Sequence, residues 1–208
     1  MKFIIIFTLV TFLEIGGGQS NAEQVITFGP EETKLVGSIP YTVLGQYQAQ
    51  FKVFKGRMVL DEKDQVRSVD LMIEANSIES NCPWCDKIAR SRRLLYTARY
   101  PKIIFKSDQV IKDKTSYKVK GTLEMHGIRR RMVFPFKGRI VFDPNAKGQF
   151  FDLKGNWIIN RKDFNIVWNK WLDKGGVLVG DHFTVSWEIK VSLKALHSRS
   201  SQPIRPVQ

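Results

Sequence analysis

An alternation of apolar and polar side chains between Tyr117 and Phe142, which restarts after a turn, is the feature that most constrains the fold. The apolar members before the turn residues His126 and Gly127 are Tyr117, Val119, Gly121, Leu123 and Met125, and those after it are Met132, Phe134, Phe136, Ile140 and Phe142. This period of two predicts two antiparallel strands joined by a tight turn. Because a lone hairpin cannot bury its apolar face in water, other strands must cover it.

The same period of two recurs on both sides of this hairpin, in segments 47–53, 69–73, 103–110, 151–159 and 183–193. We therefore predict an all-β fold in which one antiparallel sheet curls over its apolar side. A closed barrel is favoured because closure removes unpaired strand edges. A barrel of about eight strands has an interior that side chains fill or that holds one small ligand. Fourteen Phe and five Trp suit an aromatic-lined interior.

Residues 76–100 break this rhythm, and here a short helical insertion is predicted near residues 84–99. Ile88, Leu95 and neighbouring arginines fall at helical spacing, and Pro101 provides a stop. Long ordered connections often serve as lids or binding loops. The insertion is either such a lid or a plug that closes one end of the barrel.

The first 22 residues have the pattern of a cleaved secretory signal peptide. An apolar run follows Lys2, and small residues precede a cleavage point between Ala22 and Glu23. The run is shorter than the roughly 20 residues that span a bilayer, which argues against a retained anchor. We predict an exported protein with the periplasm as its destination, one domain over residues 23–196, and a disordered basic tail over residues 197–208.

The formal net charge of +13 favours anionic partners. Export argues against nucleic acid, which leaves lipid headgroups and acidic proteins. Basic residues gather at Arg90 to Arg93, at Arg99 with Lys102, and at Arg129 to Arg131. They are either solvated surface or one face that makes transient contact with an anionic membrane. The oligomeric state stays open, a homodimer included.

The segment Cys82-Pro83-Trp84-Cys85 is the sharpest local motif. In an oxidising compartment it forms either a local disulfide that pins the insertion or a redox-active pair of thiols. Asp86 stands where covalent haem attachment would need His, and the chain has too few clustered His and Cys residues for zinc. No metal and no covalent cofactor are predicted. Nothing has the pattern of an activated serine, a paired-carboxylate site or a phosphate loop, so no enzymatic activity is predicted apart from the dithiol.

Several segments, in order along residues 25–195, resemble the YceI-like family of exported lipid-binding proteins. They are Asn76-Ser77-Ile78, Tyr100-Pro101-Lys102-Ile103-Ile104-Phe105-Lys106-Ser107, the hairpin from Tyr117 to Ile128, Asn160-Arg161-Lys162-Asp163-Phe164, and Val179-Gly180-Asp181. The resemblance implies an eight-stranded, lipocalin-like antiparallel barrel whose apolar cavity holds a long-chain isoprenoid, a quinone or a similar amphiphile. The Cys82–Cys85 motif, the run Arg129 to Arg131, and Asn165 in place of the usual Gly depart from the family pattern.

The leading hypothesis is an exported carrier of such a lipid. The predicted cavity-lining residues are Tyr47, Phe51, Leu71, Ile73, Phe105, Leu123, Phe134, Phe136, Trp157, Ile159, Val185 and Trp187. His126 is a candidate for bonding the headgroup of the lipid, unless it only bonds backbone near its turn. Two alternatives remain: a thiol-disulfide redox accessory protein that uses Cys82 and Cys85, and a filled barrel that acts as an interaction module without a ligand.

Overall fold

The computed structural model describes residues 24–31, 33–41, 45–144, 148–169 and 178–192. Eleven strands of this part of the chain form one sheet. The strands are β1 (Gln24–Phe28), β2 (Thr33–Tyr41), β3 (Gly45–Phe51), β4 (Phe54–Leu60), β5 (Val66–Glu74), β6 (Ile78–Glu79), β7 (Lys102–Asp113), β8 (Ser116–Met125), β9 (Ile128–Asp143), β10 (Gly148–Asn160) and β11 (His182–Ser192). The helices are α1 (Pro83–Arg90) and two short 3-10 helices, η1 (Ala75–Ser77) and η2 (Arg161–Phe164). The predicted signal peptide and basic tail lie outside the described residues.

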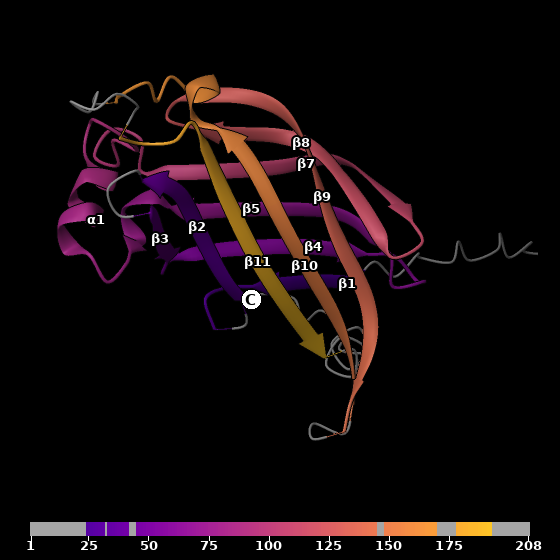
Figure 1. Ribbon diagram of the computed structural model, residues 1–208. Coiled ribbons are helices and arrows are strands. Elements are labelled where there is room, and N and C mark those ends of the chain that lie inside the picture. Colours follow the sequence, from indigo (N-terminus) through magenta and orange to yellow (C-terminus); the bar gives the residue numbers. More distant parts are fainter. Residues whose placement is uncertain (1–23, 32, 42–44, 145–147, 170–177, 193–208) are drawn as a thin grey trace, which may run out of the picture.

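The sheet is curled, and all of its strand pairs are antiparallel. Its order is β1-β4-β5-β7-β8-β9-β10-β11-β2-β3-β6, and β3 leads directly into β4 through Lys52 and Val53. The Lys52 amide donates to the Ser77 carbonyl and the Glu74 amide donates to the Val53 carbonyl, each at 3.0 Å. In Figure 1, β2, β10 and β11 cross in front of β4 and β5. The prediction of an all-β, curled antiparallel sheet is therefore confirmed. The expected closed barrel is not: the strand order ends at β1 on one side and β6 on the other, so the described strands form a curled half-barrel.

The predicted number of eight strands is wrong, because the described residues contain eleven. Residues 24–28, which lie outside every predicted strand, form β1 and pair with β4 from Gln24 opposite Leu60 to Phe28 opposite Gly56. The strand predicted over residues 47–53 ends at Phe51, and β4 begins at Phe54 after Lys52 and Val53. The 3-10 turn η1 then separates β5 from β6. These breaks bend long strands around the curl, and side-chain alternation alone does not locate them.

The hairpin predicted between Tyr117 and Phe142 is confirmed as β8 and β9. Met125 pairs with Ile128 across a two-residue turn formed by His126 and Gly127. Both turn residues have positive φ, 53° and 75°, as a tight hairpin turn of this hand requires. A side chain at Gly127 would also place its Cβ 2.6 Å from the Tyr100 ring. Gly127 therefore allows Tyr100 to pack against the turn.

The helical insertion is shorter than predicted, since α1 ends at Arg90 rather than near residue 99. The next residue, Ser91, has an extended backbone, and its amide and hydroxyl both donate to the Ile88 carbonyl. The Leu95 amide then turns back to the Ala89 carbonyl at 2.9 Å. This turn directs both Leu94 and Leu95 into the interior, where each is buried. Adjacent leucines on a continued helix would point about 100° apart, so burying both favours the turn.

Aromatic side chains fill the part of the interior enclosed by β8, β9, β10 and β11. The Phe134 and Trp157 rings stack with centroids 4.3 Å apart, and Trp187 meets Trp157 edge-on at 5.6 Å. Trp187 lies so close to Gly155 that a Cβ there would come within 2.3 Å of the indole ring. The space left in the interior lies between this cluster and the residues of the insertion.

Candidate internal cavity

An internal cavity of about 90 Å³ lies between the sheet and the insertion. The residues that line it are Gly37, Ser38, Ile39, Tyr47, Phe51, Leu71, Ile73, Ile78, Ala89, Leu94, Leu95, Ile103, Phe105, Leu123, Met125, Trp157, Ile159, Phe183 and Val185. Ser38 and Tyr47 carry the hydroxyl groups of this lining, and its other side chains are apolar or aromatic. Ala89 comes from α1, and Leu94 and Leu95 come from the turn after it. The insertion therefore forms one wall of the cavity.

Nine of the twelve predicted cavity residues line this space. They are Tyr47, Phe51, Leu71, Ile73, Phe105, Leu123, Trp157, Ile159 and Val185. The other three, Phe134, Phe136 and Trp187, belong to the aromatic cluster. Alternation identifies which side chains point inward, but not how deep each lies along the barrel.

Sequence reasoning missed several residues of the lining. Ile103, Met125 and Phe183 follow the same inward alternation as their predicted neighbours, so the pattern could have identified them. Ala89, Leu94 and Leu95 belong to the insertion, whose path over the sheet depends on contacts distant in the sequence. No local pattern points to those three residues.

Two smaller cavities of about 20 Å³ each adjoin the central one. The first shares Ile39, Tyr47, Ala89 and Leu94 with the central cavity and extends to Trp84, Cys85 and Ile88. The second shares Leu71 and Trp157 with it and extends to Phe28, Met58 and Trp187. The two small cavities have no lining residue in common, so the central cavity lies between them. The three cavities together outline an elongated apolar path, which side chains interrupt between one cavity and the next.

A buried carboxylate fixes α1 over this path. Asp86 accepts hydrogen bonds from the Tyr47 hydroxyl at 2.7 Å and from the Ser80 hydroxyl and amide at 2.6 and 3.0 Å. Burial opposes ionisation of Asp86, but the hydrogen bonds from Ser80 and Tyr47 and the charge of Arg90 outweigh burial and lower its pKa. Burial and the neighbouring Asp86 raise the pKa of Tyr47, so its hydroxyl remains a donor. The charged carboxylate therefore holds α1 against β3.

His126, the candidate for the lipid headgroup, is not among the residues that line the cavity. Its Nδ1 lies 3.0 Å from the Phe164 carbonyl oxygen, to which it donates, and its ring lies 4.5 Å from the Tyr100 ring. The described residues provide no hydrogen-bond partner for its buried Nε2. Burial and the charge of Arg99 lower the pKa of His126, while the bond to Phe164 acts in the opposite direction. In this position the ring joins the β8–β9 turn to η2.

The lowered pKa of His126 predicts a loss of stability in mild acid. Because the unfolded chain binds the proton at higher pH than the folded chain, the free energy of unfolding falls as pH drops from about 7 to 5. The loss is less than about 1 kcal/mol, because solvent screens the partly exposed ring. Urea unfolding across this range should show a weaker pH dependence in His126→Asn, since Asn tolerates the positive φ. The exposed His182 provides the control, and an equal effect of His182→Asn would contradict this assignment.

Basic side chains gather near the segment that follows β10. Arg93 lies over the Trp168 ring at 5.4 Å, and Arg130 donates to the Asp163 carbonyl at 3.0 Å. Arg99 lies over the Tyr100 ring, which in turn packs on His126 beside Phe164. By contrast, Arg129 pairs with Glu124 on β8 and Arg131 pairs with Asp108 on β7. Part of the predicted cationic face therefore converges at the end of the sheet where the β8–β9 turn meets η2.

Cys82 and Cys85 form a disulfide, which is the form expected in an oxidising compartment. Within the described ranges, no three His, Cys, Asp or Glu residues come together as a metal site would require. The same ranges contain no helix with the length and apolar character needed to cross a membrane.

The structure defines an all-β protein in which a curled antiparallel sheet holds an apolar cavity and a short helix covers one end. The chain belongs to the YceI-like domain family, whose family model matches residues 26–191. It is 28% identical over 175 residues to a UPF0312 protein of Pectobacterium atrosepticum, covering 80% of this chain and 87% of that protein. It is 27% identical over 167 residues to Protein YceI of Salmonella newport, with the same two coverages of 80% and 87%.

Solved structures share the fold at low sequence identity. The crystal structure of Burkholderia cenocepacia BcnA has a TM-score of 0.64 at 17% identity, covering 77% of this chain and 97% of that one. A polyisoprenoid binding domain from Saccharophagus degradans, implicated in plant cell wall breakdown, has a TM-score of 0.56 at 12% identity, covering 83% and 99%. These TM-scores show a common fold and no more than that.

Proposed function

We propose that the protein is an exported, non-enzymatic carrier that holds the apolar tail of an amphiphilic lipid in its internal cavity. The observation that carries this proposal is the cavity itself, which is lined almost wholly by apolar side chains from the sheet and the insertion. The proposed ligand is a long-chain isoprenoid, either a polyprenyl lipid or a quinone, bound without a covalent link. The structural likeness to a polyisoprenoid binding domain supports this choice. The predicted signal peptide over residues 1–22 supports export to the periplasm.

Tail burial would provide most of the binding free energy. Each CH2-sized group of the tail that is removed from water contributes about 0.8 kcal/mol. A five-carbon isoprene unit therefore contributes roughly 4 kcal/mol before the conformational entropy lost by the tail is subtracted. The central cavity of about 90 Å³ is smaller than the roughly 300–1,000 Å³ of common ligand pockets. The three cavities together also stay below this range, so a long tail requires them to join and to widen as side chains move. Trp157 and Leu71 separate the central cavity from one neighbour, while Tyr47 and Leu94 separate it from the other.

The basic side chains of Arg93, Arg99 and Arg130 give this carrier a surface for loading. Each cation near an anionic membrane contributes about 1 kcal/mol of attraction. The insertion that carries Arg93 and Arg99 also carries Leu94 and Leu95, which line the cavity. Transient contact with a membrane through these arginines would bring lipid close to the insertion.

A titration with isoprenoid alcohols of increasing length, from geraniol to geranylgeraniol, tests the proposal. Trp157 lines the cavity, so its fluorescence should change on binding, and affinity should rise roughly tenfold or more per isoprene unit until the path is full. Trp157→Phe keeps a ring in place and should remove much of the fluorescence change. Absence of binding at every tail length would contradict lipid carriage and favour a module without a ligand.

A further inference from the structure

The disulfide Cys82–Cys85 occupies the N-terminus of α1, a helix of eight residues. Cys82 is the N-cap, Pro83 is in the first turn, and the Cys85 amide donates to the Cys82 sulfur at 3.3 Å. Pro at the start of a helix leaves no amide unsatisfied there and fixes the local backbone. If the disulfide is reduced, the hydrogen bond from the Cys85 amide and the positive end of the helix dipole both favour the thiolate form of Cys82.

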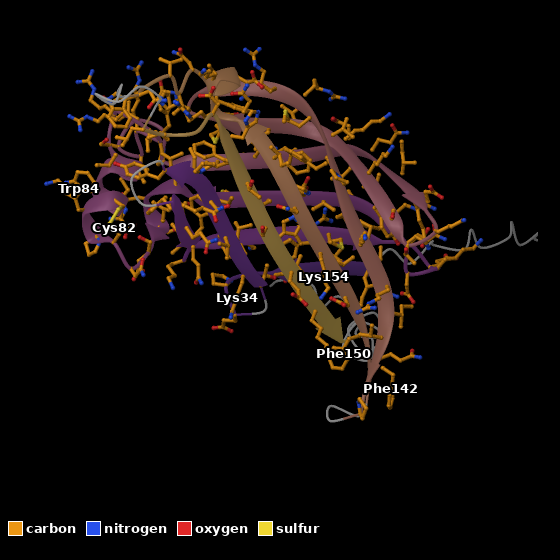
Figure 2. The ribbon with its side chains drawn as sticks, viewed as in Figure 1. Lys34, Cys82, Trp84, Phe142, Phe150 and Lys154 are labelled. Carbon is orange, nitrogen blue, oxygen red and sulfur yellow. A yellow bond between two sulfur atoms is a disulfide. The ribbon has the colours of Figure 1, made fainter. Side chains whose placement is uncertain are left out.

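The two sulfurs have different surroundings. Cys85 lines the small apolar cavity beneath α1 together with Ile88 and Trp84, an environment that disfavours a thiolate. Cys82 is the helix cap and does not line that cavity. Figure 2 places Cys82 and Trp84 at the outer end of the molecule on α1. Both cysteines are half-buried, but of the two only Cys85 lines this apolar cavity, so the surroundings of their sulfurs differ.

Hydrogen bonds hold α1 at both ends, and an exposed aromatic ring lies beside the disulfide. Asp86, the acidic residue in the first turn of α1, is buried and already accepts three hydrogen bonds from Tyr47 and Ser80. Arg90 donates to the carbonyls of Asn76 and Ile78, which holds the other end of the helix. Trp84, between the two cysteines, is 62% exposed. A large exposed aromatic ring beside a disulfide is a contact point for a protein substrate.

We propose that Cys82–Cys85 is a redox-active disulfide that exchanges with a dithiol of a partner protein, and that Cys82 forms the mixed disulfide. The thiolate of the partner attacks the Cys82 sulfur, the Cys82–Cys85 bond breaks, and Cys85 leaves as a thiolate that takes a proton. The second thiolate of the partner then attacks its own sulfur in the mixed disulfide and releases Cys82 as a thiolate. Two electrons pass from the partner to the pair, so the partner is oxidised to a disulfide. This activity is independent of lipid carriage.

Equilibration of the full chain with glutathione redox buffers tests whether the pair is redox-active. The fraction of reduced pair is measured by thiol alkylation and mass spectrometry. A redox-active pair is reduced in step with the ratio of reduced to oxidised glutathione, whereas structural disulfides resist the glutathione pool. A pair that remains oxidised in a large excess of reduced glutathione would overturn the proposal and mark a bridge that only pins the insertion.

Matched single variants test which sulfur reacts. Cys85→Ser and Cys82→Ser both lack the disulfide, so a comparison between them cancels the effect of its loss. Cys85→Ser should form a mixed disulfide with oxidised glutathione roughly tenfold or more faster than Cys82→Ser. Equal rates, or a faster Cys82→Ser, would contradict the assignment of Cys82.

Two further measurements separate docking and carriage from exchange. Trp84→Ala should slow exchange with a reduced, unfolded protein but leave exchange with glutathione unchanged. Equal rates with the protein substrate would remove Trp84 from the docking site. Cys82→Ser removes the reactive sulfur at a residue outside the cavity lining, and it should still bind isoprenoid alcohols. Loss of lipid binding in that variant would contradict the independence of the two activities.

Discussion

Replacement of Arg161 by Ala is expected to lower the free energy of unfolding by about 3–5 kcal/mol. The side chain is fully buried, at 0% exposure. Its guanidinium donates to the carbonyl oxygens of Gly180 at 2.8 Å, Ile166 at 2.5 Å, Trp168 at 2.9 Å and Val179 at 3.4 Å, and it pairs with Asp181 at 3.3 Å. Removal of the side chain takes this donor away from the carbonyls of Gly180, Ile166 and Trp168, whereas the Val179 carbonyl still accepts from Asn169 at 2.7 Å.

Arg161→Lys should recover only part of this loss, because an ammonium group cannot reach carbonyls on both sides as the guanidinium fork does. Lys162→Ala is the matched control, since exposed Lys162 bonds the same Asp181 at 2.7 Å. An exposed ion pair contributes less than about 1 kcal/mol. Urea unfolding of the three variants measures these differences. A loss in Arg161→Ala no larger than that in Lys162→Ala would contradict the role of Arg161 as the centre of this network.

Substitution of Gly37 by Leu is expected to lower isoprenoid affinity by about tenfold or more, equivalent to about 1.4 kcal/mol. Gly37 lines the cavity from β2, and a Cβ there would meet only ordinary contacts, the nearest being the Phe51 ring at 3.7 Å. A leucine side chain would therefore fill part of the cavity proposed to hold the lipid tail, and it would remove no existing contact. The melting temperature should remain unchanged or rise, because Gly in a strand interior is destabilising by about 0.5–1 kcal/mol relative to Ala.

Two controls accompany Gly37→Leu. Gly37→Ala fills less of the cavity and should weaken binding less than Leu does. Gln48→Leu places the same leucine side chain at an exposed position on the neighbouring strand β3, and should leave binding unchanged. Calorimetric titration with the tightest isoprenoid alcohol, beside a thermal melt of each variant, provides the comparison. Unchanged affinity in a folded Gly37→Leu would place the ligand outside this cavity.

The sequence predicted the elements whose signals are local. The hairpin of β8 and β9 follows from alternation and from the turn residues His126 and Gly127, all within one stretch of chain. The inward orientation of nine cavity residues follows from the same period of two. Asn165 stands where the YceI-like family usually has Gly, and it adopts the left-handed conformation with φ of 57°. Asn is among the few residues that tolerate this backbone.

What the sequence did not predict depends on contacts between distant segments. The break between β3 and β4 at Lys52 and Val53 is set by hydrogen bonds to Glu74 and Ser77 across the sheet. The depth of Phe134, Phe136 and Trp187 within the interior depends on the register of the four strands β8, β9, β10 and β11 with one another. The end of α1 at Arg90 depends on the burial of Leu94 and Leu95 beneath it. No window of neighbouring residues contains this information.

Native mass spectrometry of the mature chain, purified without detergent from an exporting host, tests the central claim most directly. The interior of the folded protein is proposed to enclose a lipid tail, so a fraction of molecules should carry the added mass of one isoprenoid lipid. Gly37→Leu should lose this added mass while keeping the charge-state distribution of a folded protein. Repeated preparations that show only the bare chain mass, together with no uptake of an added polyprenyl lipid or quinone, would contradict the account.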